Sequence, residues 1–221
     1  MGKTNDGKCM FCGETFGKAA IKKHLDKCNA RTKEYITEDV AKAEKYFCIF
    51  AQGYENPEYW IYIDIPVNTT LKVLDEFLRD IWLECCGHLS AFDINGQTFS
   101  CSPDKDYGDK SMSIKLENVL AVGMKFDHEY DFGSTTSLKL KVISEFDGKK
   151  RKKEAKLLAR NNPPIIKCSY CDQPATNVCC GCVYDEDGWV CDDCIDKHEC
   201  GEDMMLPVVN SPRVGVCAYE G

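Results

Sequence analysis

The residues with the clearest chemistry are cysteines and histidines, which occur at metal-ligand spacing near both ends of the chain. Residues 168–200 hold eight cysteines and one histidine. Thiolates and imidazoles are the ligands that structural zinc prefers, and two closed tetrahedral sites need eight of them. Eight residues of this stretch fall into three CxxC pairs and a final pair: Cys168 and Cys171, Cys179 and Cys182, Cys191 and Cys194, and His198 and Cys200. The spacing therefore predicts two zinc ions in this region.

The spacing of these pairs does not by itself determine how they share the two ions. Alternating pairs resemble the interleaved cross-brace of B-box, MYND and HIT zinc fingers. On that arrangement one ion is held by Cys168, Cys171, Cys191 and Cys194, and the other by Cys179, Cys182, His198 and Cys200. Cys180 and Cys217 remain as spare thiols, and either could replace a ligand of the second ion. A module of this size, with so many charged residues, needs metal ions to fold.

A third zinc site is predicted near the start of the chain, where the ligand pattern is Cys9-x2-Cys12-x11-His24-x3-Cys28. A helix would present the last two ligands one turn apart, with Ile21 and Leu25 on one apolar face. The pattern resembles the classical zinc finger in its Cys-Cys-His-Cys variant, with Phe16 at the expected offset. The sequence thus predicts about three Zn²⁺ ions per chain. The base-reading positions of such a finger would be Gly17, Ala20 and Lys23, and only Lys23 can donate a hydrogen bond, so sequence-specific DNA recognition is not expected.

The net charge of −8 is unevenly distributed. Two basic segments, 1–33 and 147–164, each carry +5, whereas 34–146 carries −10 and 165–221 carries −8. The basic segments could contact phosphates without sequence specificity, or they could be solvated surfaces. The candidate nucleic-acid contacts are Lys18, Lys22, Lys23, Lys27, Lys149, Lys150, Arg151, Lys152 and Lys153. The acidic C-terminal region favours a protein partner.

Whether the 16 cysteines form disulfides or bind metal depends on the redox state of the cellular compartment. The first residues contain no apolar stretch of signal-peptide length, and no window approaches the length of a membrane span. We therefore expect a soluble, cytoplasmic protein, in which metal binding is favoured over disulfides. No membrane partner and no small-molecule substrate are expected.

The middle of the chain has the longest regular patterns. Residues 47–53 and 59–67 are rich in aromatic and β-branched residues and predict paired strands. Residues 68–86 place apolar side chains at helical spacing, and Asn95-Gly96 predicts a tight turn before further strands, including 136–146. The fold class is therefore α+β, a central mixed or antiparallel sheet with one principal helix, flanked by two small zinc-binding modules. The basic segment 147–164 is expected to be an exposed linker with a short helical stretch that Pro163 ends.

A family resemblance rests on three motifs in the middle region. They are PVNTTL at 66–71, His88-Leu89-x2-Phe92-x-Ile94-x-Gly96, and Tyr130-Asp131-Phe132-Gly133. Together they resemble the plasmid pRiA4b ORF-three-like family, also labelled insertion-element passenger proteins of TnpR type. The resemblance implies an α+β domain over 34–146 and a contextual link to mobile elements, but no activity. The chain departs from the pattern at Ser134-Thr135-Thr136, where the family often has acidic residues and a tryptophan.

Two readings of the function follow. The preferred one is a non-enzymatic zinc-binding protein that acts as an interaction or regulatory adaptor, organised as a finger (1–33), an α+β domain (34–146), a basic linker (147–164) and a two-zinc module with its tail (165–221). The alternative is an enzyme in which His88 and His128 act with Asp131 or Glu129, provided that the fold brings them together. The remaining cysteines, Cys48, Cys85, Cys86 and Cys101, are predicted to be small core hydrophobes.

Overall fold

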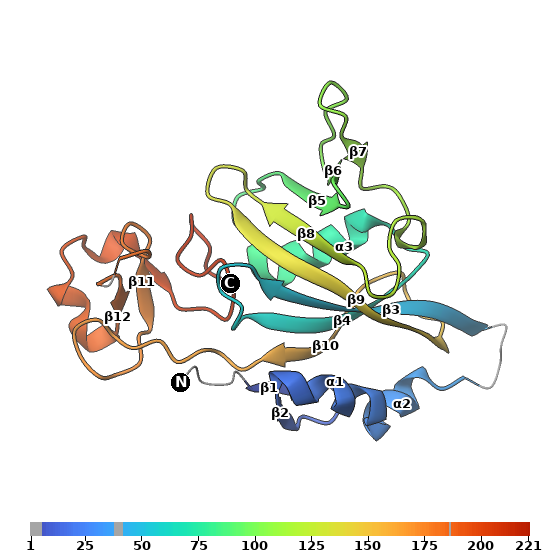
Figure 1. Ribbon diagram of the computed structural model, residues 1–221. Coiled ribbons are helices and arrows are strands. Elements are labelled where there is room, and N and C mark those ends of the chain that lie inside the picture. Colours follow the sequence, from blue (N-terminus) through green and yellow to red (C-terminus); the bar gives the residue numbers. More distant parts are fainter. Residues whose placement is uncertain (1–5, 38–41, 186) are drawn as a thin grey trace.

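The computed structural model describes residues 6–37, 42–185 and 187–221. A large sheet forms its centre (Figure 1). Its ten strands among the described residues are β1 (Asp6–Cys9), β2 (Thr15–Gly17), β3 (Ala43–Gly53), β4 (Trp60–Pro66), β5 (Ser90–Ile94), β6 (Gln97–Ser100), β7 (Lys110–Ser111), β8 (Lys125–Tyr130), β9 (Thr136–Lys149) and β10 (Lys156–Asn161). Their spatial order is β2-β1-β10-β4-β3-β9-β8-β5-β6-β7, and every pairing is antiparallel except β6 with β7.

The central strands form where the β-branched and aromatic runs predict them. Strands β3 and β4 pair in register from Tyr46 opposite Pro66 to Gln52 opposite Trp60. Asn95 and Gly96 both have positive φ, 54° and 78°, which suits the tight turn that joins β5 to β6. The predicted strand pair and the predicted Asn-Gly turn are therefore confirmed.

One face of the sheet is covered by the principal helix, α3 (Leu71–Leu78), which continues into a single π-helical turn, Arg79–Leu83. Leu71, Leu74 and Leu78 recur every three or four residues and are completely buried. They pack with inward-facing residues of β3, β4, β8 and β9 in the main hydrophobic core. The helix therefore lies where its apolar stripe is removed from water.

The opposite face of the sheet is covered by the N-terminal finger. Its helices are α1 (Lys18–Lys27) and α2 (Asn29–Tyr35), which lie below the sheet in Figure 1. Ile21 and Leu25 of α1 pack with Trp60 and Tyr62 of β4 in a second hydrophobic cluster. Because successive strand residues point to opposite faces, Ile61, Ile63 and Ile65 face α3 while Trp60 and Tyr62 face the finger. This two-sided coverage explains why every residue of β4 is buried.

The segment 147–164 was expected to be an exposed, partly helical linker; most of its basic run is exposed, but 147–149 and 156–161 belong to strands of the sheet. Strand β9 extends to Lys149, and β10 occupies 156–161, between β4 and the finger strand β1. The helix prediction there was wrong because β10 makes ladder hydrogen bonds on both sides, to partners distant in sequence. Arg151 from the basic run forms an ion pair with Asp64, which is completely buried.

The C-terminal module is a separate small sheet beside the central one (Figure 1). It contains β11 (Asn177–Cys179), β12 (Trp189–Val190) and β13 (Met205–Pro207), with 3₁₀ turns at Asp192–Lys197 and Glu202–Met204. The chain then returns to the central domain, where Ser211 Oγ donates a 2.6 Å hydrogen bond to the carbonyl oxygen of Trp82.

The predicted fold class is confirmed: an α+β fold with a large, mostly antiparallel sheet, few helices, and cysteine clusters on its flanks. Of the helices among the described residues, none has the length and apolar character needed to cross a membrane.

Candidate metal centres

Four groups of cysteine and histidine side chains converge in the described part of the chain. Within each group, one ligand atom per residue lies within 4.8 Å of all the others. In a tetrahedral zinc site, bonds of about 2.3 Å to sulfur place two sulfurs about 3.8 Å apart, and a sulfur about 3.6 Å from an imidazole nitrogen.

The N-terminal group is Cys9, Cys12, His24 and Cys28. Cys9 ends β1, and the turn that follows it is closed by a 2.9 Å hydrogen bond from Gly13 N–H to the Cys9 carbonyl. Helix α1 places His24 one turn before Cys28, which is its C-cap residue. The sulfurs of Cys9 and Cys28 are 4.0 Å apart, and Cys12 Sγ is 3.2 Å from His24 Nε2. The four predicted ligands therefore lie together at distances near those of a tetrahedral site.

The surroundings shift the pKa values of two thiols in this group in opposite directions. Burial alone raises the pKa of the Cys28 thiol, but the backbone N–H groups of Arg31 and Ala30 and the neighbouring Cys9 and Cys12 thiols together outweigh it, so the pKa lies below its usual value. Burial raises the pKa of Cys9 to about 11. The Phe16 ring stacks on the His24 imidazole, with centroids 3.9 Å apart, and limits its rotation. A metal ion would supply the positive charge that lets all three sulfurs be thiolates.

The first C-terminal group is Cys168, Cys171, Cys191 and Cys194. Each CxxC motif supplies two of these ligands, and the two motifs lie side by side in the fold. Cys171 Sγ lies 3.6 Å from Cys191 Sγ. Burial raises the pKa of Cys168, but backbone N–H groups of Cys191 and Tyr170 and the neighbouring thiols outweigh burial and lower it to about 6. At neutral pH this group would therefore already hold one thiolate.

The second C-terminal group is Cys179, Cys182, His198 and Cys200. Cys182 Sγ is 3.6 Å from Cys200 Sγ. His198 is buried, its Nδ1 lies 3.0 Å from the Tyr170 hydroxyl, and its Nε2 has no hydrogen-bond partner. A buried ring nitrogen with no hydrogen-bond partner, beside three thiols, fits a metal ligand because coordination would use its lone pair.

The two C-terminal groups have the interleaved membership that the cross-brace pattern predicts, since ligand pairs alternate between them along the chain. Among the described residues, Cys180 belongs to none of the four groups. All three predicted sets are brought together, and their chemistry, mostly sulfur with one or no imidazole, fits zinc. That these residues bind zinc stays a prediction.

The fourth group was missed by the sequence analysis. Cys85, Cys86 and His88 follow the π-helical turn, and Cys217 reaches them from the C-terminal tail. The prediction that Cys85 and Cys86 are core hydrophobes was wrong for Cys86, which is exposed; Cys101 is exposed as well, whereas Cys48 is buried as predicted. The spacing Cys85-Cys86-x-His88 was a local signal for three ligands, but nothing in the sequence links it to Cys217.

The candidate catalytic residues have separate partners. His128 is completely buried, and its Nε2 lies 2.7 Å from Asp75 Oδ1 on α3. His88 Nε2 is 3.6 Å from Asp131 Oδ2, while that oxygen accepts a 2.7 Å hydrogen bond from Arg213. The two histidines thus face different carboxylates, and Asp131 is engaged by an arginine.

Some of the candidate nucleic-acid contacts form hydrogen bonds or ion pairs within the protein, and the others are exposed. Lys18 Nζ donates 2.7 Å hydrogen bonds to Gln52 Oε1 and to the Pro57 carbonyl, and Lys22 pairs with Asp26. Arg151 is held by Asp64. The remaining predicted contacts are exposed: Lys23, Lys27, Lys149, Lys150, Lys152 and Lys153.

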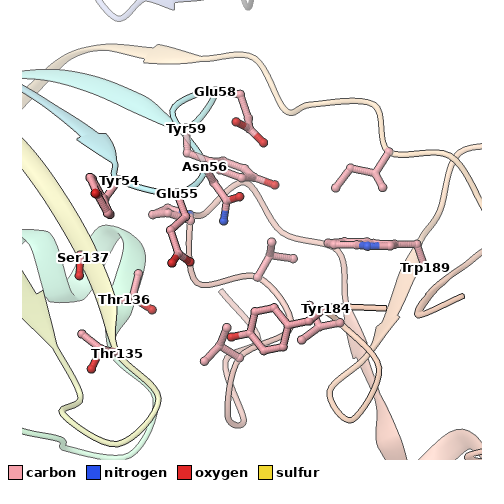
Figure 2. Close-up of a pocket in the computed structure, with 15 residues that line it drawn as sticks. Tyr54, Glu55, Asn56, Glu58, Tyr59, Thr135, Thr136, Ser137, Tyr184 and Trp189 are labelled. Carbon is pink, nitrogen blue, oxygen red and sulfur yellow. The ribbon is translucent and has the colours of Figure 1, made fainter. Parts of the chain in front are cut away.

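A cavity of about 170 Å³ lies between the central domain and the C-terminal module. Figure 2 shows the Tyr184 and Trp189 rings on the module side, across from Glu55 and Tyr59 of the β3–β4 turn. Tyr184 is 81% exposed, whereas Tyr59 is buried. The cavity is thus lined by aromatic rings and has acidic groups at its edge.

Comparisons with known proteins give little further information. No family model matches the chain, and no curated protein matches it. The resemblance to the pRiA4b ORF-three-like family therefore stays a prediction. The chain is similar to a solved structure described as a protein of unknown function, MM3350, from Methanosarcina mazei Go1, at 17% identity, with a TM-score of 0.43, over 52% of this chain and 67% of that one.

Proposed function

We propose that this protein is a zinc-structured adaptor that binds a protein partner and has no catalytic metal. The observation that carries the proposal is that each predicted ligand group offers four protein ligands. A tetrahedral ion held by four protein ligands has no open position for water or substrate, which is the mark of a structural site. The ions would then fix the shape of a surface used for binding.

The cavity between the two domains is the proposed partner site. Its aromatic rings and the nearby carboxylate of Glu55 suit a positively charged side chain, which gains both cation–π attraction and an ionic partner. The net charge of −8 on 165–221 would attract the same kind of partner. We therefore propose that the occupant is a lysine- or arginine-containing segment of another protein.

The proposal is tested by fluorescence anisotropy with the metal-loaded full chain. The probes are a fluorescein-labelled peptide that contains lysine and the same peptide with glutamine in place of each lysine. The lysine peptide should bind more tightly. Tyr184→Ala should weaken binding about two- to fivefold, the range that one exposed cation–π contact provides. Glu55→Gln should weaken binding as well, because it removes the ionic partner. Tyr107→Ala is the matched control, because Tyr107 is 86% exposed and lies outside the cavity.

Equal binding of both peptides, or no binding of either, would contradict the proposal. A single-stranded DNA oligonucleotide provides a second arm of the test. If it binds, with an affinity that falls steeply with salt and is unaffected by the two cavity substitutions, the exposed lysines of the basic segments would be the functional surface instead.

A further inference from the structure

We infer that Cys85, Cys86, His88 and Cys217 form a fourth zinc site, which fastens the C-terminal tail to the central domain. This site is additional to the three that the sequence spacing predicts, and it is independent of the proposed partner binding. Three cysteines and one histidine are the same ligand types as in the N-terminal finger. Soft thiolate ligands with an imidazole select Zn²⁺ over the hard cations Mg²⁺ and Ca²⁺.

The distances within the group agree with one shared ion. Cys217 Sγ lies 3.7 Å from Cys86 Sγ and 3.7 Å from His88 Nε2. Both values are close to the separations of about 3.8 Å and 3.6 Å that a tetrahedral zinc site requires. The corresponding sulfur–sulfur distances in the three predicted groups are 4.0, 3.6 and 3.6 Å. The fourth group therefore has the same spacing as the other three.

The first three ligands are positioned by the central domain. The Tyr130 hydroxyl, on β8, accepts hydrogen bonds from the N–H groups of Cys85 and His88, at 3.4 and 3.3 Å. Glu84 accepts the Gly87 N–H at 2.6 Å, and Gly87 has a φ of +76°, the left-handed conformation that glycine adopts without strain. The bend of the chain from Cys85 to His88 is thus held by contacts that do not involve the sulfurs.

The fourth ligand is positioned separately, by the tail. Arg213 is completely buried and donates hydrogen bonds to Asp131, Thr136 and the Ser134 carbonyl. Cys217, four residues later, has a φ of +58°, a conformation that non-glycine residues seldom adopt. Arg213 Nη2 also donates a 3.4 Å hydrogen bond to Cys85 Sγ, so two segments that are 129 residues apart in sequence bring their ligand atoms together through contacts between the tail and the central domain.

A disulfide between Cys86 and Cys217 is the competing explanation. It would require the two sulfurs to approach to about 2.05 Å, and it would leave Cys85 and His88 with only their contacts to Arg213 and Asp131. The convergence of all four side chains favours the metal ion. Two members of the group, Cys86 and Cys217, are exposed, whereas each other group has at most one exposed member. We therefore expect this ion to be the first of the four that a chelator removes.

Metal content of the purified full chain is the first test. Inductively coupled plasma mass spectrometry should find about four zinc ions per chain, and Cys217→Ser or Cys86→Ser should remove one of them. Cys101→Ser is the matched control, because Cys101 is exposed and lies in none of the four groups. Three ions in the native protein, with no change in either variant, would overturn the inference.

Alkylation of the native protein is a second test that needs no variant and does not depend on the folding of one. Iodoacetamide labelling followed by peptide mass spectrometry should find Cys86 and Cys217 much slower to react than Cys101, until a chelator is added. Rates equal to that of Cys101 before chelation would refute the site. A Cys86–Cys217 cross-linked peptide, lighter by two hydrogens, would establish the disulfide in its place.

Discussion

Arg213 and Asp131 form a buried ion pair between the C-terminal tail and the β8–β9 turn, with 2.7 Å between Arg213 Nη2 and Asp131 Oδ2. The guanidinium also lies over the Tyr130 ring, 4.8 Å from its centroid. Asp131 has a φ of +65°, and its other carboxylate oxygen accepts the N–H groups of Gly133 and Ser134. The aspartate of the Asp-Phe-Gly triplet is therefore an anchor for the tail.

Loss of this anchor should be costly. Arg213→Met leaves the Asp131 carboxylate buried without its cation, which typically destabilises a protein by about 3–5 kcal/mol. Adding Asp131→Asn should recover part of that loss. Urea unfolding measures both, with Lys153→Ala, at an exposed position, expected within about 0.5 kcal/mol of the parent. An Arg213→Met protein as stable as the parent would show that the pair contributes nothing.

Docking of the finger on the sheet depends on Gly7 in β1. A β-carbon there would collide with the Trp60 ring and lie 2.6 Å from the Arg160 carbonyl oxygen. Gly7→Ala should therefore cost about 1–3 kcal/mol and increase amide exchange in β1 and β10, as measured by hydrogen–deuterium exchange. Gly17→Ala is the control in the same hairpin, since the nearest atom to its added carbon is 3.6 Å away. Equal exchange in the two variants would argue against this close contact.

Metal removal should affect the chain unevenly. The buried cluster at the start of the C-terminal module consists of Val190 and three cysteines, so a chelator should unfold that module. The central sheet has a large apolar core that includes α3, and none of the fully buried residues of this core is a predicted ligand; Cys85 of the fourth group is partly buried against it. Amide exchange should rise in β11–β13 and stay slow in β3, β4 and β9. The chelator saturated with zinc is the control, and uniform loss of protection would mean that the sheet also depends on metal.

Alkaline pH should destabilise the contact between the finger and the sheet. Burial raises the pKa of Tyr62 from 10.0 to about 12, with smaller contributions from Cys48 and Asp26. Because the folded pKa exceeds the unfolded value, the contribution to stability is complete below pH 10 and is lost as pH rises toward 12. Tyrosinate absorbance should show one fewer late ionisation in Tyr62→Phe than in the parent protein. Early ionisation of Tyr62 would contradict this burial.

Local patterns in the sequence determined much of this protein. The strand pair β3–β4, the Asn95-Gly96 turn and the stripe of α3 depend on residues close together in the chain, so their chemistry predicts them directly. The CxxC pairs and His24-x3-Cys28 could also be predicted from the sequence, because a tight turn or one helical turn fixes the distance between neighbouring ligands. The interleaved grouping of the C-terminal cysteines was expected from the resemblance of their alternating pairs to cross-brace fingers, since spacing alone does not determine which pairs share an ion.

Tertiary structure decided the features that depend on distant segments. Residues 156–161 have a helix-like composition, yet they form β10 because β1 and β4 satisfy their backbone hydrogen bonds from both sides. Arg151 belongs to a basic run that the sequence predicts to be exposed. In the fold it forms an ion pair with the buried Asp64 carboxylate. The sequence predicted that Cys217 is a spare thiol. In the fold, the tail is held by Arg213, and Cys217 lies beside Cys86 and His88. Contacts across 129 residues leave no local pattern, because only the packed fold brings the two segments together.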